Sequence, residues 1–311
     1  MEQQLKPTVE KLRSILARIG LAEADRADIR AFTCAEDGTE YAVWLVETEA
    51  QKTVLKRAKA YELACYENFF SEPTDSVPAL LGACRDGDVD WFLTEYCEGE
   101  DLRRCDTKRL LRALDALIAL QDRFWQREDL YDCCIPLEKG LKAAKDRGRY
   151  LGSERLERVY ADFLRIYQET PRTLCHEDLL PINVLVGETR AVLIDWEHAG
   201  MLPYMGAFAR LIAHGRERED AYFYLTEADR ALAIDYYFEH LIKPHGIAYE
   251  TYRKTLDYFL FFEYCEWIML GNRYDGRDDA RYGYYQTLAN RLADRLLTAG
   301  DACETSARLL Y

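Results

Sequence analysis

The apolar positions of the first hundred residues recur first with the period of a helix and then mainly in short segments typical of strands. From Leu5 to Ile19 they recur at helical spacing and Gly20 stands where such a helix would end, which predicts an amphipathic leading helix. Short segments rich in β-branched and aromatic residues follow and predict strands, with a turn at Asp37-Gly38 after the first of them. We expect strands at 29–35, 41–48, 52–57, 79–85 and 89–96, and a helix at about 59–70.

Beyond Gly99 the apolar pattern changes mainly to the period of helices. We expect helices at about 108–126 and 137–168 and a β-rich segment at 172–195. Helical patterns then continue through 207–215, 227–242 and 249–300. Strands with one helix followed by a helical region are typical of a small α+β lobe joined to a larger helical lobe. We therefore predict an N-terminal lobe at 1–98 and a C-terminal lobe at 99–311.

The composition is that of a globular protein with an excess of acidic residues. Hydrophobic residues make up 49% and charged residues 31% of the 311 positions, which excludes a disordered or low-complexity chain. The 55 acidic and 41 basic residues give a formal charge of −14 at pH 7. Such a chain repels phosphate backbones, so we expect no nucleic-acid partner. The charge suits a cationic small molecule, although acidity that serves only solubility is the plainer alternative.

Two further absences in the sequence bear on location. No apolar run approaches the roughly 18 residues that a membrane helix needs, so we expect no membrane partner. The N-terminal segment has scattered charges and no continuous apolar core, so we expect no signal peptide. The ten cysteines include no C-x-x-C pair that would suit zinc. These features together favour a cytoplasmic protein with reduced thiols.

The segment CHEDLLPIN holds three polar residues in the spacing H-x-D-x-x-x-x-N, namely His176, Asp178 and Asn183. A proline within it indicates a loop rather than a helix. The following residues, VLVGETRAVLID, predict a hairpin that ends at Asp195. We therefore expect Asp178, Asn183 and Asp195 to lie together at one end of a short β-ribbon.

This set of residues is suited to phosphoryl transfer. An aspartate beside a hydroxyl can accept its proton as the hydroxyl attacks a terminal phosphate, which is the part we assign to Asp178. An asparagine oxygen and a second aspartate, Asn183 and Asp195, can hold Mg²⁺ against the phosphates. The alternative is that these residues only shape turns and cap a strand. The ordered set, with a hairpin between its members, favours the catalytic interpretation.

A lysine and a glutamate in the predicted first lobe fit the same chemistry. Lys56 ends the third predicted strand, where its ammonium could contact the α- and β-phosphates of a nucleotide. Glu62 lies early in the following helix and could hold Lys56 by an ion pair. The alternatives are that Lys56 is only an edge charge, or that its partner is Glu67, which lies on a different face of the same helix.

These motifs resemble those of the aminoglycoside phosphotransferase and choline kinase superfamily, which shares the protein-kinase fold. CHEDLLPIN and LIDWEHAGM are similar to segments of bacterial choline kinases, and FLTEYCEGEDL resembles the hinge of the antibiotic kinases. The resemblance implies a bilobal α+β protein-kinase-like fold, with a small antiparallel-sheet lobe and a larger, mostly helical lobe. By the same resemblance Asp178 would be the catalytic base, and Asn183 and Asp195 would be the magnesium ligands. Lys56 and Glu62 would be the phosphate-binding pair. The hinge backbone of Glu95, Tyr96 and Cys97 would receive the purine of ATP or GTP.

The sequence departs from the superfamily pattern in three places. Glu177 stands where protein kinases have arginine, which argues against regulation through a pair of arginine with a phosphorylated residue. Trp196-Glu197 replaces Phe-Gly with no A-P-E segment after it, which argues against a protein substrate. In many relatives an aspartate follows shortly after the metal motif, the segment that here contains Asp195, and braces the catalytic loop, which here contains Asp178. Residues 206–210 supply no such aspartate. This last departure keeps open a second interpretation, a catalytically inactive nucleotide-binding regulator of the same fold.

The predicted helical segment 251–271 is apolar on nearly every face, yet it carries Glu263 and Glu266 three residues apart. A buried carboxylate needs a positive partner. That partner is either an arginine of the same lobe, such as Arg210 or Arg273, or an ammonium on the substrate. In the second case Trp267 offers the substrate a cation–π face.

The sequence thus predicts a magnesium-dependent small-molecule kinase. It would transfer the terminal phosphate of ATP or GTP to a hydroxyl of a cationic amino alcohol or aminosugar, with aminoglycosides and choline as the classes that the resemblance suggests. Glu263, Glu266 and Trp267 are the predicted substrate residues. Besides the inactive regulator, a kinase for a neutral sugar or alcohol is the alternative.

Overall fold

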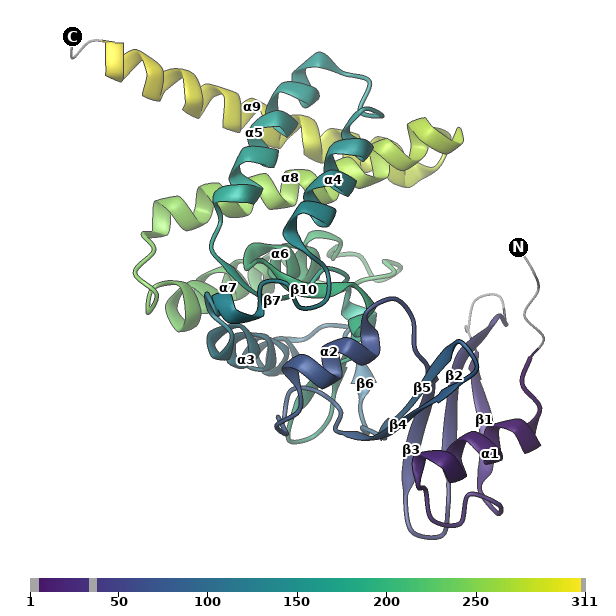
Figure 1. Cartoon of the computed structure of the whole chain (residues 1–311). Coiled ribbons are helices and arrows are strands. Elements are labelled where there is room, and N and C mark those ends of the chain that lie inside the picture. Colours follow the sequence, from purple (N-terminus) through teal and green to yellow (C-terminus); the bar gives the residue numbers. More distant parts are fainter. Residues whose placement is uncertain (1–5, 34–37, 309–311) are drawn as a thin grey trace.

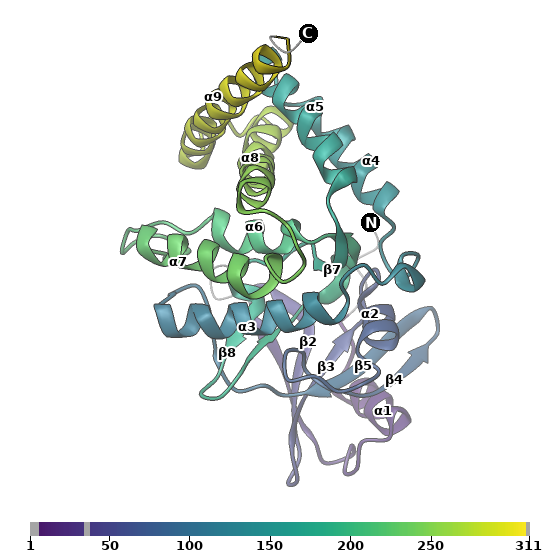
Figure 2. The same cartoon turned by 90° about the vertical axis from the view of Figure 1, so that its left-hand side faces the viewer.

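The computed structural model describes residues 6–33 and 38–308, with side chains as far as residue 298. Figure 1 and Figure 2 show two parts, a small antiparallel sheet with a helix on it and a larger, mostly helical part. This arrangement confirms the predicted α+β architecture. Leu5 and Asp37, at the start of the predicted leading helix and in the predicted turn, lie outside the described residues.

The small part is a five-stranded sheet in the order β1-β2-β3-β5-β4. Its strands are β1 (Asp28–Thr33), β2 (Glu40–Glu47), β3 (Lys52–Arg57), β4 (Leu80–Asp86) and β5 (Val89–Glu95). Helix α1 (Val9–Ile19) covers one face, and its Ile15 and Leu16 form a small core with Leu55 and Trp91. Gly20 ends α1 in the left-handed conformation (φ 96°), as the sequence predicts.

Strand β3 directs Lys56 away from this small core. Successive side chains of a strand point to opposite faces of the sheet. Leu55 is 0% exposed in the core beneath α1, so Lys56 leaves on the other face. Lys56 lies between Val43 of β2 and Phe92 of β5 in the sheet, which fixes its backbone from both sides.

Helix α2 (Glu62–Phe69) belongs by its packing to the larger part of the molecule. Its Cys65, Tyr66 and Phe69 are buried in the large core, and Phe70 contacts Trp196 with 4.8 Å between ring centroids. In Figure 1 α2 lies between the sheet and the helical part. The helix therefore connects the strand that carries Lys56 to the segment that carries Asp195.

The larger part combines helices with two small antiparallel sheets, β7 with β10 and β6-β8-β9. The strands are β6 (Glu100–Asp101), β7 (Arg172–His176), β8 (Val184–Val186), β9 (Ala191–Leu193) and β10 (Ala199–Pro203). The α-helices are α3 (Thr107–Arg123), α4 (Leu137–Gly148), α5 (Glu154–Glu169), α6 (Met205–Ala213), α7 (Glu227–Tyr237), α8 (Tyr249–Tyr274) and α9 (Ala280–Arg308). Short 3₁₀ turns lie at η1 (Glu128–Leu130), η2 (Pro181–Asn183) and η3 (Trp196–His198), and a π turn, η4 (Phe238–Ile242), extends α7.

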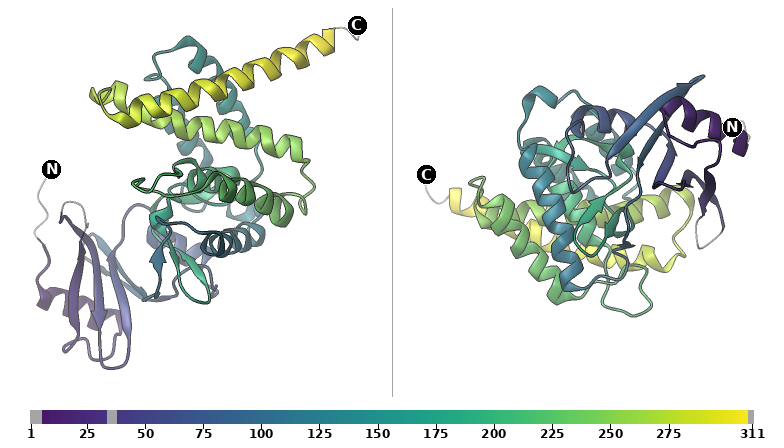
Figure 3. Two further views of the ribbon diagram at one scale, coloured as in Figure 1. Left: turned by 180° about the vertical axis from the view of Figure 1, so that it is seen from behind. Right: turned by 90° about the horizontal axis from the view of Figure 1, so that it is seen from below.

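Two long helical segments of the sequence each contain a pair of helices. The single helix predicted at 137–168 is therefore wrong, whereas α8 confirms the helix predicted at 251–271. The segment 137–168 breaks between α4 and α5, where Gly152 takes φ 66° and Ser153 caps α5. The segment 249–300 breaks after α8, where Asp275 takes φ 56°. In both cases the two helices pack on the same core, so the apolar pattern continues across the break. Figure 3 shows α8 and α9 packed side by side at the end of the helical part that lies away from the sheet.

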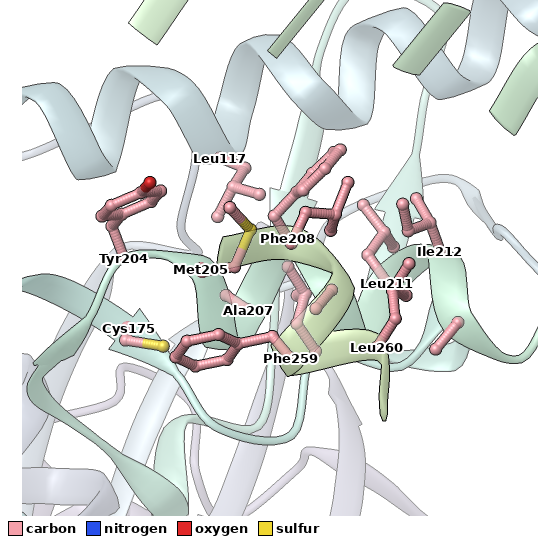
Figure 4. Close-up of a cluster of buried hydrophobic side chains, with 14 of the residues drawn as sticks. Leu117, Cys175, Tyr204, Met205, Ala207, Phe208, Leu211, Ile212, Phe259 and Leu260 are labelled. Atoms are coloured by element: carbon pink, nitrogen blue, oxygen red, sulfur yellow. The ribbon is translucent and has the colours of Figure 1, made fainter. Parts of the chain in front are cut away.

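Helix α6 packs its apolar side chains in a buried cluster with Leu117 of α3, Cys175 of β7 and Phe259 of α8 (Figure 4). Its Phe208 stacks on Tyr237 of α7 with 4.1 Å between ring centroids. Only Gly206 and Arg210 of this helix are less than fully buried. None of the helices among the described residues combines the length and the hydropathy needed to cross a membrane.

Candidate active site

The loop between β7 and β8 carries the H-x-D-x-x-x-x-N residues and is held by its own hydrogen bonds. The backbone N–H of Asp178 donates to Nδ1 of His176 (3.3 Å), and Nε2 of His176 donates to the carbonyl of Ile194 (2.8 Å). His176 is buried, and this burial lowers its pKa, so the ring stays neutral in this role. His176 thus ties the loop to the strand end that precedes Asp195.

The same loop holds Asn183 between Asp178 and Asp195. The Asn183 side-chain amide donates from Nδ2 to the backbone carbonyl of Asp178 (2.7 Å). The carbonyl of Asn183 accepts from the N–H of Ile194 (3.0 Å), and Asp195 follows with φ 68°. The hairpin β8–β9 therefore brings Asp178, Asn183 and Asp195 into one hydrogen-bonded unit, at the end of a short β-ribbon.

Lys56 reaches this unit from the small sheet. Its Nζ forms an ion pair with Glu62 of α2 and lies 3.2 Å from Oδ1 of Asp195. Burial by itself would lower the pKa of Lys56, but the two carboxylates outweigh it and raise that pKa. Burial also works to raise the pKa of Asp195, and the Lys56 ammonium outweighs it, so the pKa of Asp195 is lowered. The partner of Lys56 is Glu62, while Glu67 lies exposed on another face of α2.

The donor atoms at Asn183 and Asp195 fit a magnesium ion. The Nδ2 group of Asn183 is already engaged, which leaves the amide oxygen as the free donor. Asp195 uses Oδ1 toward Lys56 and retains Oδ2. Oxygen donors are those that Mg²⁺ prefers, and at a nucleotide it takes only one or two protein side chains beside phosphate oxygens and water. Among the described residues no three His, Cys, Asp or Glu side chains are grouped to hold a metal by themselves.

The predicted hinge, Glu95 to Cys97, joins β5 to the larger part. The carboxylate of Glu95 accepts from Nη2 of Arg190 (2.5 Å), which comes from the β8–β9 turn. Burial, with help from Glu95, raises the pKa of the Cys97 thiol to about 12, so the thiol stays protonated at neutral pH. Gly99 follows, and a Cβ there would lie 2.9 Å from the Val186 carbonyl. The hinge is thus hydrogen-bonded to the β8–β9 turn through Glu95, and Gly99 just after it packs closely against β8.

Arg210 of α6 contacts Asp178 and both glutamates that the sequence singled out. Its Nε and Nη2 lie 2.9 and 2.7 Å from Oδ1 of Asp178. Its Nη1 donates to Glu263 (2.9 Å) and to Glu266 (3.1 Å) of α8. Burial by itself would lower the pKa of Arg210, but the surrounding carboxylates outweigh it and raise that pKa. Of the two kinds of partner considered for these glutamates, the structure shows the arginine of the same lobe.

Trp267, the third predicted substrate residue, contacts two side chains of α9. Its ring stacks on Tyr285 with 5.5 Å between centroids. The guanidinium of Arg281 lies 4.4 Å from its ring centroid. Arg273, the other arginine considered for Glu263, lies instead over the rings of Tyr150 and Tyr274. A direct contact of Glu263, Glu266 or Trp267 with a substrate stays a prediction.

Glu177, next to the predicted base, is half-buried beside this cluster. Burial and the Glu263 carboxylate raise the pKa of Glu177 to about 7, against the opposing effect of Arg210. The pKa of a glutamate in an unfolded chain is about 4.3. Between these values the folded protein binds a proton that the unfolded chain has lost, so this group's contribution to stability falls as the pH rises.

We therefore expect Glu177→Gln to be more stable than the wild type, and increasingly so at high pH. The difference in the free energy of unfolding in urea should grow by about 1–2 kcal/mol between pH 5.5 and pH 8.5, after allowance for partial exposure. Glu188→Gln, at an exposed turn position, is the control and should show no such growth. A pH-independent difference for Glu177→Gln would contradict the raised pKa.

The contact between Arg210 and Asp178 is the main feature that the sequence analysis missed. The sequence named Arg210 only as a possible partner of Glu263, although it is the one charged residue in the apolar segment MGAFARLIA. That isolation was the available signal, because a charge on an otherwise buried helix must meet a partner. The ion pair between Arg147 of α4 and Glu266, and the contact of Arg190 with Glu95, were also not predicted.

Comparison with known proteins gives one family. Residues 33–241 match the family model described as the phosphotransferase enzyme family. In sequence, the chain is similar to the protein LicA of Haemophilus influenzae, with 26% identity over 116 residues, which is 37% of this chain and 40% of that LicA. A second LicA from Haemophilus influenzae matches at 25% identity over 32% of its length. The chain thus matches well under half the length of these curated relatives.

Solved structures match nearly the whole chain. Choline kinase from Cryptosporidium parvum Iowa II superposes with a TM-score of 0.58 at 13% identity, covering 93% of this chain and 97% of that one. An aminoglycoside phosphotransferase in a ternary complex with ADP and hygromycin B gives a TM-score of 0.54 at 14% identity, covering 91% and 97%. These likenesses confirm the predicted fold, the protein-kinase-like fold of the aminoglycoside phosphotransferases and choline kinases.

Proposed function

The chain belongs to the phosphotransferase enzyme family, and from this premise we propose that it transfers the terminal phosphate of ATP or GTP to a hydroxyl of a cationic small molecule. One observation carries the proposal. Lys56 from the sheet, Glu62 from α2 and Asp195 from the β8–β9 ribbon meet around one ammonium group, and Asn183 and Asp178 are hydrogen-bonded to the same ribbon.

Each of these residues has a part in the proposed reaction. Lys56, fixed by two carboxylates, would contact the α- and β-phosphates of the nucleotide, whose purine would lie against the backbone of Glu95, Tyr96 and Cys97. Asp178 would orient the acceptor hydroxyl and take its proton. Asn183 and Asp195 would hold Mg²⁺, which when bound neutralises charge on the phosphates.

The alternative, an inactive nucleotide-binding regulator, rested on the missing bracing aspartate. In the structure, the helix that follows the metal motif does contact the catalytic loop, through the pair of Arg210 with Asp178. The loop is also held by His176 and Asn183. The absence of the aspartate therefore does not leave the loop without support, which favours the enzyme over the regulator.

The charge around the base supports a cationic acceptor. Glu177, Asp178, Glu263 and Glu266 gather around two guanidinium groups, those of Arg147 and Arg210. Even without Glu177, whose raised pKa keeps it partly protonated near neutral pH, three carboxylates face two guanidinium groups, and the whole chain has a formal charge of −14. A positive group on the acceptor would reduce this excess. Choline and aminoglycosides, substrates suggested by the names of the structural relatives, both carry such a group.

A phosphorylation screen over choline, aminoglycosides and neutral sugars, with ATP and GTP as competing donors, tests this function. We expect Mg²⁺-dependent transfer to an amine-bearing acceptor, with kcat/KM at least about 30-fold above that of a neutral analogue, because a desolvated charge pair is worth about 2 kcal/mol or more. In Glu266→Gln this preference should shrink. Preference for a neutral or anionic alcohol would contradict the acceptor class, and nucleotide binding without transfer to any acceptor would favour the regulator.

A further inference from the structure

The polar face of α6 is turned toward the predicted base. Gly206 and Arg210 are one helical turn apart and are the two positions of α6 that the core does not fully enclose. A Cβ on Gly206 would lie 3.1 Å from both Sγ of Cys175 and Oε1 of Glu177. Helix α6 is therefore packed directly against the catalytic loop, and its apolar side chains fix it in the large core (Figure 4).

Arg210 holds one oxygen of Asp178 and leaves the other available. Two separate N–H groups, on Nε and Nη2, donate to Oδ1 at 2.9 and 2.7 Å. Within the described residues Oδ2 of Asp178 accepts no hydrogen bond, and the Asp178 side chain is 31% exposed against 19% for Arg210. Arg210 is thus the more buried partner of this pair, and Oδ2 of Asp178 is left without a protein partner among the described residues.

Arg210 is itself fixed by two residues of α8. Its Nη1 donates to both Glu263 and Glu266. Glu263 also accepts from Nε2 of His214 (3.1 Å), whose Nδ1 lies 2.9 Å from the Tyr285 hydroxyl of α9. Because Nε, Nη1 and Nη2 of Arg210 all donate to carboxylates, the guanidinium group is held in one orientation.

We propose that Arg210 is a positioning residue for the phosphoryl-transfer reaction, acting through the catalytic base Asp178. The inference rests on the proposed function. A carboxylate turns easily about its last bond, since such torsions have broad minima. Two N–H donors on Oδ1 stop this rotation and keep Oδ2 directed at the acceptor hydroxyl. Because phosphoryl transfer depends mainly on positioning and on charge, the orientation of this carboxylate matters more than its strength as a base.

This positioning role requires the geometry of an arginine side chain and not only its charge. The fork of a guanidinium can bind Asp178 on one side and the α8 carboxylates on the other at the same time. A lysine offers one compact ammonium group and cannot span both sides. The contact also links the helix after the metal motif to the catalytic loop, which is the connection that the missing aspartate would otherwise make.

Kinetics of Arg210→Lys, Arg210→Gln and Arg210→Ala test the proposal, with the acceptor found in the screen. Misplacement of a reacting group by about 1 Å costs about 100-fold in rate, so we expect kcat of Arg210→Gln to fall about 100-fold, and Arg210→Lys to recover only part of it. The KM for the nucleotide should stay within about twofold. Millimolar guanidinium should restore part of kcat in Arg210→Ala and should leave the wild type unchanged.

Arg230→Gln is the matched control. Arg230 also contacts α6, but it donates to the carbonyls of Ile212 and Gly215 and not to Asp178. We expect this variant to melt at a lower temperature and to keep kcat within about threefold. An equal loss of kcat in Arg230→Gln and Arg210→Gln, or no response of Arg210→Ala to guanidinium, would mean that Arg210 only stabilises α6.

A double-mutant cycle with Asp178→Ala, read from the equilibrium constant of unfolding, needs no activity. We expect the two changes to be coupled by about tenfold, and coupling below about twofold would show that Arg210 does not act through Asp178. If the wild type transfers no phosphate to any acceptor, the proposed function is wrong and the positioning part falls with it. If the wild type is active and Arg210→Gln keeps more than a third of kcat, only the present inference is wrong.

Discussion

The substitution Asp178→Asn should lower kcat by about 10²–10⁴-fold and leave nucleotide affinity within about twofold of the wild type. An asparagine keeps the shape of the side chain but cannot accept the proton of the acceptor hydroxyl, and a positioned general base contributes about this factor. The nucleotide residues Lys56, Glu62 and Asp195 form their own contacts and do not depend on the Asp178 side chain. Steady-state kinetics and calorimetric titration with the nucleotide measure the two quantities.

The control for this experiment is thermal unfolding of the same variant. Arg210 can still donate to the oxygen of an asparagine, although it loses the charge of the carboxylate. A melting temperature near that of the wild type, with kcat lost, would support the assignment of Asp178 as the base. Turnover within about tenfold of the wild type would show that another group takes the proton.

The substitution Lys56→Met should destabilise the fold and also remove activity. Glu62 is 1% exposed, so without the lysine its carboxylate is buried beside a second carboxylate, that of Asp195. Breaking a buried ion pair at one partner costs about 3–5 kcal/mol. We expect a loss of about 3 kcal/mol in the free energy of unfolding, measured in urea. We also expect kcat/KM for the nucleotide to fall by at least about 100-fold, because the phosphate ligand is gone.

The double variant Lys56→Met with Glu62→Met separates these two losses. Replacing both members of a buried pair by apolar residues of similar size often restores stability. We expect the double variant to regain most of the lost free energy of unfolding and none of the lost kcat/KM. Recovery of activity together with stability would mean that Lys56 supports the fold and does not bind the nucleotide.

The features that the sequence determined by itself are those whose partners are close along the chain. Asp178, Asn183 and Asp195 lie within twenty residues, and the hairpin β8–β9 between them is built by local turn and strand preferences. Lys56 and Glu62 are separated by six residues, which cover the end of β3 and the start of α2. Local backbone geometry therefore accounts for the grouping within each of these two segments. The meeting of Lys56 with Asp195, 139 positions apart in the sequence, depends on how the small sheet packs against the larger part.

From the sequence, elementary electrostatics predicted that a buried glutamate needs a positive partner, but it did not identify that partner. A glutamate in an apolar helix must meet a positive group, so the sequence required one for Glu263. Which cation fills that place depends on how α6 packs on α8, since Arg210 and Glu263 are 53 residues apart. In the same way, the breaks between α4 and α5 and between α8 and α9 are hidden by an apolar pattern that both helices of each pair share.

The orientation of the predicted base was decided only by the tertiary structure. Arg210 reaches Asp178 across 32 residues, and it does so because the apolar face of α6 is locked in the core while Gly206 lets the helix approach the loop. Neither the packing of α6 nor the direction of a side chain at its edge follows from periodicity, because periodicity gives the buried face of a helix and not the residue that it meets. The sequence by itself predicted the reacting groups, and long-range packing decided which side chains hold them.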